Sequence, residues 1–79
     1  MTEEQIRQFK TILSQYSGKS PEEIDDGMKF RDDLQMSSLD FMTLLGELED
    51  EFDIEFEEVE GIKLDTVGDA IEYLGGILA

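Results

Sequence analysis

The sequence contains no cysteine and no histidine, and these two absences exclude much of the chemistry that small proteins perform. Without cysteine there is no disulfide, no thiol nucleophile and no thiolate metal ligand. Without histidine the commonest general base is missing, and zinc sites built from Cys and His are excluded. Carboxylate and lysine chemistry remain, but 79 residues do not easily enclose a substrate-sized pocket. We therefore expect no catalytic residue, no metal site and no enzyme activity.

Basic residues are also scarce, with six lysines and arginines against 21 acids and a formal net charge of -15. Such a chain repels nucleic acid and anionic membranes and is attracted to basic protein surfaces. Disorder is not expected, because 39% of the residues are apolar and many recur at helical spacing. Uninterrupted apolar runs are pairs or triplets, and no charged-then-apolar leader is present. We expect a cytoplasmic monomer that does not insert into membranes.

The first 18 residues predict a helix over residues 2–17. Thr2 and Gln5 have the spacing of a capping box, in which each side chain accepts a hydrogen bond from the other residue's backbone. Gly18 is suited to the left-handed conformation that ends a helix. One apolar stripe at steps of three and four residues contains Ile6, Phe9, Ile12, Leu13 and Tyr16.

Two further helices are predicted by the same signals. The second covers residues 38–51, with Ser37 and Asp40 as a capping pair. The last begins at Thr66–Asp69, again with capping-box spacing, and we expect Gly75–Gly76 to end or fray it. The apolar stripe of the second helix contains Leu39, Met42, Leu44, Leu45, Leu48 and Phe52; that of the last contains Val67, Ala70, Ile71 and Leu74.

The connections complete the predicted fold. Residues 19–37 form a long loop with one helical turn at Ser20–Glu23. Residues 52–56 alternate between apolar and acidic and predict an extended link, and residues 57–60 a short helix closed by Gly61. The fold class is all-α, a small four-helix bundle of three longer helices and one short helix, in a single domain over residues 1–79. The loop is expected to be anchored to the core by Ile24, Met28, Phe30 and Leu34.

Three segments, in order and in spacing, carry a resemblance to a known family. They are Asp33–Asp40 (DLQMSSLD), Leu48–Ile54 (LEDEFDI) and Thr66–Ala70 (TVGDA). Together they resemble acyl carrier proteins, whose modification motif is an Asp-Ser-Leu triplet at the start of the second helix. The match covers nearly the whole chain. It implies the acyl-carrier bundle and a protein that carries acyl chains without catalysing their chemistry.

The resemblance implies that Ser38 carries a covalent 4'-phosphopantetheine arm, attached from coenzyme A by a phosphopantetheinyl transferase. Because the chain has no histidine or cysteine, Ser38 has no internal base and would be a passive acceptor. The arm would supply the thiol that the sequence lacks. Ser37 stands where the family normally has aspartate, and its spacing to Asp40 assigns it to the helix cap.

An acidic stretch flanks Ser38 on both sides, with twelve acids and no lysine or arginine between Asp32 and Ile62. Charge runs are usually solvated faces. The resemblance implies instead that basic patches on acyl transferases and synthases dock here. Leu39 and Met42 could belong to an apolar strip of this docking face or to the core, and Gly46 could permit a close approach. The candidate docking residues are Leu39, Asp40, Met42, Gly46, Glu47, Glu49 and Asp50.

The sequence leaves the cargo open. A carrier of fatty-acyl or polyketide-type chains is the first hypothesis. A carrier of aminoacyl or peptidyl units in a specialised pathway is the alternative within the class. From a different class, an unmodified acidic interaction protein would share the composition but would accept no arm.

Overall fold

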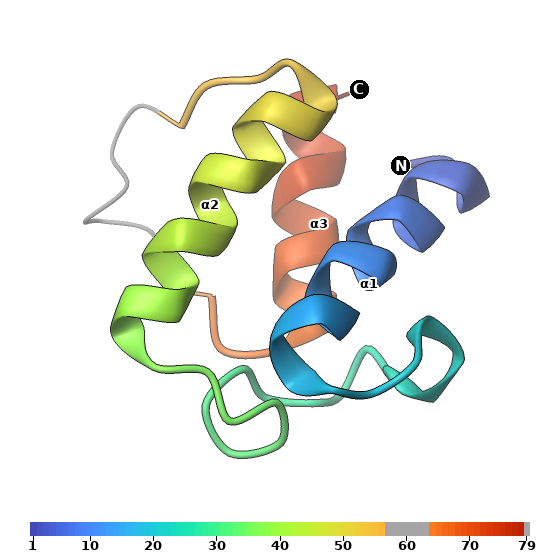
Figure 1. Ribbon diagram of the computed structural model, residues 1–79. Coiled ribbons are helices and arrows are strands. Elements are labelled where there is room, and N and C mark those ends of the chain that lie inside the picture. The colour runs from blue at the N-terminus through green and yellow to red at the C-terminus, as the bar shows by residue number, and fades with distance from the viewer. Residues whose placement is uncertain (57–63, 79) are drawn as a thin grey trace.

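The computed structural model describes residues 1–56 and 64–78 and contains three α-helices and one short 3₁₀ helix among them (Figure 1). These are α1 (Glu3–Ser17), η1 (Pro21–Glu23), α2 (Ser38–Phe52) and α3 (Val67–Leu78). No strand occurs in these two ranges, which confirms the all-α class. The short helix predicted at residues 57–60 lies outside the described residues.

Capping groups explain where the long helices begin. Thr2 Oγ1 accepts from the backbone N–H of Gln5, and the Gln5 side chain accepts from Thr2 N, so both halves of the predicted box are present. Gly18 ends α1 in the left-handed region, with φ 74°. Thr66 and Asp69 make the equivalent pair of bonds before α3. Each box satisfies N–H groups that have no partner within the helix.

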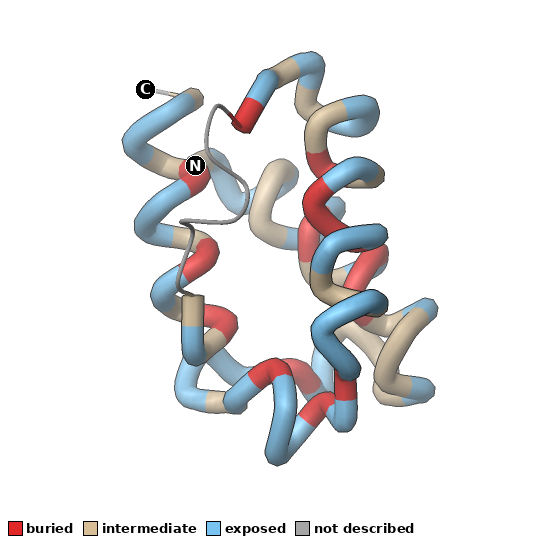
Figure 2. The backbone as a smooth tube through the Cα atoms, turned by 90° about the vertical axis from the view of Figure 1, so that its left-hand side faces the viewer, coloured by how far each residue is buried: buried red, intermediate tan, exposed pale blue. Residues whose placement is uncertain are grey.

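The helices enclose one apolar core, and Figure 2 shows buried positions on their inward sides and along the long loop. Three of the four predicted loop anchors are buried and the fourth, Met28, packs half-buried against them. Burial of loop side chains stabilises a connection that would otherwise be too long to be ordered. The buried residues are Phe9, Ile12, Leu13, Ile24, Phe30, Leu34, Met36, Leu44, Leu45, Leu48, Phe56, Val67, Ala70 and Leu74.

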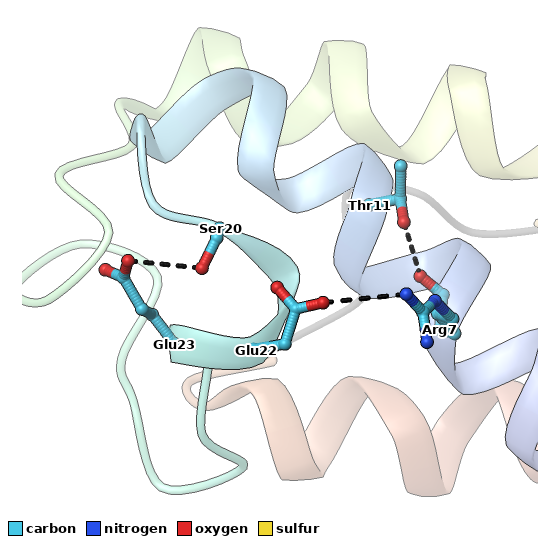
Figure 3. Close-up of polar contacts among 5 residues, drawn as sticks. All are labelled: Arg7, Thr11, Ser20, Glu22 and Glu23. Atoms are coloured by element: carbon cyan, nitrogen blue, oxygen red, sulfur yellow. Dashed lines mark hydrogen bonds and ion pairs between the residues drawn. The ribbon is translucent and has the colours of Figure 1, made fainter.

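Ion pairs link α1 to η1 and to the loop that follows it (Figure 3 draws the pair to η1). Arg7 of α1 forms an exposed ion pair of 3.5 Å with Glu22, and Lys10 pairs with Asp26 at 3.3 Å. At the start of η1, the hydroxyl of Ser20 donates to Oε1 of Glu23 at 3.1 Å. Ser20 therefore precedes the predicted turn as expected, but it bonds a carboxylate and does not cap the backbone.

The loop is also tied to the start of α3 by backbone hydrogen bonds. Lys29 and Thr66 form an isolated antiparallel bridge, and Gly68 N donates to Asp26 O at 2.7 Å. A Cβ at Gly68 would lie 3.1 Å from that same carbonyl oxygen, so glycine permits this close approach. The loop and the start of α3 thereby share one end of the bundle, while the N-terminus and the end of α3 lie together at the other (Figures 1 and 2).

The prediction that Gly75–Gly76 would end the last helix is wrong, because α3 continues to Leu78. Two glycines each cost about 1 kcal/mol in a helix interior relative to alanine. Tertiary packing offsets this cost, since Leu78 packs against the core. The N-terminus lies against the helix here, with Met1 N 3.5 Å from where a Cβ of Gly75 would be.

The predicted extended link begins two residues later than expected. Phe52 is the last residue of α2, and Asp53 ends the helix in the left-handed region with φ 53°. From there the alternation holds: Ile54 is half-buried, Glu55 is exposed and Phe56 is buried. No helix in the described ranges combines the length and apolar character needed to cross a membrane.

Candidate functional site

The candidate site is the N-terminus of α2, where two adjacent serines have different roles. Ser37 is the N-cap: its Oγ accepts from Asp40 N at 3.1 Å, and the Asp40 carboxylate accepts from Ser37 N at 3.1 Å. Both residues of the pair are thus occupied by the backbone. Ser38 is the first residue of the helix and is exposed. Its hydroxyl is not part of the cap.

Ser38 has one polar side-chain contact in the described structure. Nη2 of Arg31, in the loop before α2, donates to Oγ of Ser38 at 2.7 Å. Because the guanidinium uses a lone pair of the oxygen, the hydroxyl proton remains available to another acceptor. Sequence reasoning missed this contact. A separation of seven residues across a loop has no regular periodicity that would predict it.

The loop segment before the serines is held by buried side chains on both sides of one exposed residue. Leu34 and Met36 are buried, and Gln35 between them has φ 56°, in the left-handed region. The rings of Phe30 and Phe41 meet edge-to-face at 5.3 Å and join this segment to α2. Met36 was not among the predicted anchors, although its period-two spacing from Leu34 was a usable signal. This packing fixes the end of the loop that leads into Ser38 and α2.

Two apolar side chains of α2 point to solvent next to Ser38. Leu39 is 76% exposed and Met42 is 45% exposed, whereas Leu44, Leu45 and Leu48 are buried. Of the two alternatives for Leu39 and Met42, core packing is therefore wrong, and the exposed apolar strip remains. Both were placed in the stripe by spacing alone, but α2 carries apolar residues around more than one face, and only one face meets the other helices.

Gly46 lies on the same side of α2, seven residues after Leu39 and four after Met42. It is exposed, and a Cβ there would meet nothing within 4 Å. Packing within the described chain therefore does not require a glycine at this position. Leu39, Met42 and Gly46 form a row along one side of the helix that starts beside Ser38.

The acidic candidates on α2 differ in what they contact. Asp40 belongs to the cap, Oε1 of Glu47 accepts from the phenol of Tyr16 at 2.8 Å, and Oε2 of Glu49 accepts from Phe56 N at 2.9 Å. Asp50 is exposed. Three of the four acids thus stabilise the fold while adding negative charge to α2. All seven predicted docking residues lie on α2, but three of the acids among them already have hydrogen-bond partners within the fold.

The chemistry available at this end of α2 is that of an acceptor. An exposed hydroxyl stands at a helix N-terminus, where unpaired N–H groups and the helix dipole favour a negatively charged group such as phosphate. The chain has no histidine or cysteine to remove its proton.

Comparison with known proteins agrees with this geometry. Residues 7–74 match the family model described as the phosphopantetheine attachment site. A protein of Exiguobacterium sp. strain AT1b, named acyl carrier protein, is 40% identical over 75 residues, which cover 94% of this chain and 95% of the relative.

Proposed function

The chain belongs to the phosphopantetheine-attachment family as an acyl carrier protein, and from that premise we propose that Ser38 is the residue that bears the arm. The observation that supports this choice is the division of roles between the two serines. Both serines are exposed, but Oγ of Ser37 accepts the capping hydrogen bond from Asp40 N, whereas Ser38 is the first residue of α2 and takes no part in the cap. The carrier is not itself catalytic.

Attachment uses Ser38 as nucleophile and coenzyme A as co-reactant. The Ser38 oxygen forms a bond to the phosphorus next to the pantetheine, the pyrophosphate bond of coenzyme A breaks, and the nucleotide part leaves. The serine proton passes to a base of the transferase, because this chain has no histidine or cysteine of its own. The position of Ser38 fits the phosphopantetheine arm, since the phosphate of the arm would lie at the N-terminus of α2. Once bound, the arm supplies the thiol on which acyl groups are carried as thioesters.

As an acyl carrier protein, the chain works with a phosphopantetheinyl transferase and with acyl-handling enzymes. We propose that these partners dock on α2 with a surface that carries a basic patch. This surface covers the exposed row formed by Leu39, Met42 and Gly46. The exposure of two large apolar side chains beside Ser38 supports an apolar centre to this contact. Asp50 supplies an exposed negative charge, and the charges of Asp40, Glu47 and Glu49 add to the field.

The cargo we propose is a fatty-acyl or related polyketide-type chain, carried in the cytoplasm by a monomer whose single domain covers residues 1–79. An aminoacyl or peptidyl cargo is the alternative for the same site. Partner enzymes select the cargo, and the docking charges do not distinguish between these classes.

Intact mass tests the assignment of Ser38. The protein is incubated with a broad-specificity phosphopantetheinyl transferase and coenzyme A, and the gain of one phosphopantetheine per chain is followed. Ser38→Ala is expected to gain nothing and to keep its helicity. Ser37→Ala is the matched control, and it should still be loaded while losing about 1 kcal/mol of stability with its cap. Loading of Ser38→Ala together with failure of Ser37→Ala would move the site to Ser37.

A further inference from the structure

The side chain of Arg31 contacts Ser38, and neither the cap of α2 nor the proposed docking of partners requires this contact. Its Nη2 donates to Oγ of Ser38 at 2.7 Å, and both side chains are exposed. An exposed contact between two side chains contributes little to the stability of the fold. Stability of the fold therefore does not account for this contact.

The charge balance offers this guanidinium many possible anionic partners, since the chain has 21 acids and six bases. Arg7 and Lys10 form ion pairs, whereas Lys19, Lys29 and Arg31 form none within the described residues. Of these three, Arg31 is the one whose side chain binds Ser38. Within residues 1–56 and 64–78 no carboxylate lies in ion-pair distance of Arg31, and its hydrogen bond goes to a neutral hydroxyl. A guanidinium prefers an anionic oxygen partner, and an anionic partner at this place would be a phosphate on Ser38.

Resting on the proposed attachment at Ser38, we infer that Arg31 is a positioning residue that orients the Ser38 hydroxyl for attachment and then binds the phosphodiester of the arm. Before attachment, the guanidinium occupies one lone pair of Oγ and leaves the O–H free to donate to the base of the transferase. Its positive charge also favours loss of that proton, because the developing negative charge on Oγ is stabilised.

After attachment, the same guanidinium faces a phosphodiester with one negative charge. Its planar N–H groups match the spacing of two phosphate oxygens, so the contact can become bidentate. Together with the N-terminus of α2, Arg31 would then hold the base of the arm against the protein. The positive charge of Arg31 is of the wrong sign to attract a basic partner, so docking does not account for it.

The first test measures loading kinetics with the chain before modification. Arg31→Gln removes the charge, Arg31→Lys keeps it, and Lys29→Gln is the matched control because Lys29 is exposed in the same loop and loses the same charge. With transferase and coenzyme A, Arg31→Gln should lower kcat by about three- to tenfold, with KM for the carrier not raised. Arg31→Lys should recover part of the rate, and Lys29→Gln should keep the kcat of the natural protein.

The second test uses a signal that a merely structural role would not move. The ³¹P NMR resonance of the attached phosphodiester should shift between the natural protein and Arg31→Gln, and should not shift in Lys29→Gln. High salt should move the natural protein's resonance towards that of Arg31→Gln, because screening weakens the ion pair. Thermal melts of the unloaded variants should coincide, as expected for an exposed contact.

The outcomes separate this inference from the assignment of the site. If Ser38→Ala stays unloaded while Arg31→Gln matches Lys29→Gln in both kcat and ³¹P resonance, the role of Arg31 is refuted and the attachment site stands. If Ser38→Ala is loaded, the attachment site is elsewhere and the role of Arg31 is refuted with it.

Discussion

The phenol of Tyr16 on α1 donates a hydrogen bond of 2.8 Å to Oε1 of Glu47 on α2. The two residues are 31 positions apart in the sequence, and both are half-buried. This bond joins the last turn of α1 to the helix that carries Ser38. It also shows that a carboxylate expected to serve docking has a partner inside the fold.

Tyr16→Phe removes this bond but keeps the ring. We expect the free energy of unfolding to fall by about 1 kcal/mol, because Glu47 is left half-buried without its donor. Urea denaturation measures the change. Tyr73→Phe is the matched control, since the Tyr73 side chain stacks on Phe56 and makes no hydrogen bond in the described part of the chain. Equal losses in the two variants would contradict a role for the Tyr16 hydroxyl.

The same pair predicts a loss of stability at high pH. Burial, and then the hydrogen bond to Glu47, raises the pKa of Tyr16 from 10.0 to about 12. Because the folded state favours the neutral phenol, this contribution is complete below pH 10 and is lost as pH rises through the interval to about 12. Urea midpoints across that interval should fall more steeply for the natural protein than for Tyr16→Phe. Parallel slopes would count against the prediction.

The capping carboxylate of Asp69 leads us to expect that stability is lost as pH falls. Backbone hydrogen bonds from Thr66 and then Asp65 to its carboxylate lower the pKa of Asp69 below the ordinary 3.8. The folded state therefore favours the carboxylate, and this stability is present above the ordinary pKa and lost as pH falls below it. Thermal melts of Asp69→Asn should depend less on pH there than those of the natural protein. Asp50→Asn, which removes an exposed carboxylate, should keep the natural dependence.

Substitutions at Asp50 and Glu49 separate docking from folding. Asp50→Lys reverses an exposed charge, so we expect slower loading by a basic transferase at low salt, a smaller defect at high salt, and unchanged stability. Glu49→Lys also removes the acceptor for Phe56 N, so it should slow loading and lower stability by about 1 kcal/mol. Glu4→Lys on α1 controls for net charge. A loading rate as slow in Glu4→Lys as in Asp50→Lys would show that the place of the charge is irrelevant.

Gln35 is predicted to be a point of backbone strain. Its φ of 56° is unfavourable for residues with a Cβ but not for glycine. Gln35→Gly should raise stability by about 0.5–1 kcal/mol, after the greater freedom of glycine in the unfolded chain is subtracted. Gln35→Ala should bring no gain, because alanine keeps the Cβ. Gln35 is exposed, so neither variant removes core packing, and a loss in Gln35→Gly would refute the strain.

Features that depend on neighbours within four residues could be read from the sequence. The three capping pairs, Thr2–Gln5, Ser37–Asp40 and Thr66–Asp69, each join residues three apart and are present. The choice of Ser38 over Ser37 rests on one of them. These bonds form within one turn at the start of the long helices, so residue spacing predicts them there. The same spacing at Ser20 and Glu23 gives no backbone cap before the short helix η1.

Contacts between distant segments were decided only by the tertiary structure. Leu39 and Leu45 are both apolar residues of one helix, yet 76% of the first is exposed and 1% of the second. The difference depends on where α1, α3 and the loop lie, which periodicity along α2 does not contain. For the same reason, spacing did not predict that Arg31 would reach Ser38 or that Tyr16 would bond Glu47. A side chain's partner across space is set by how the backbone folds between the two residues, whereas a cap is set by the residues beside it.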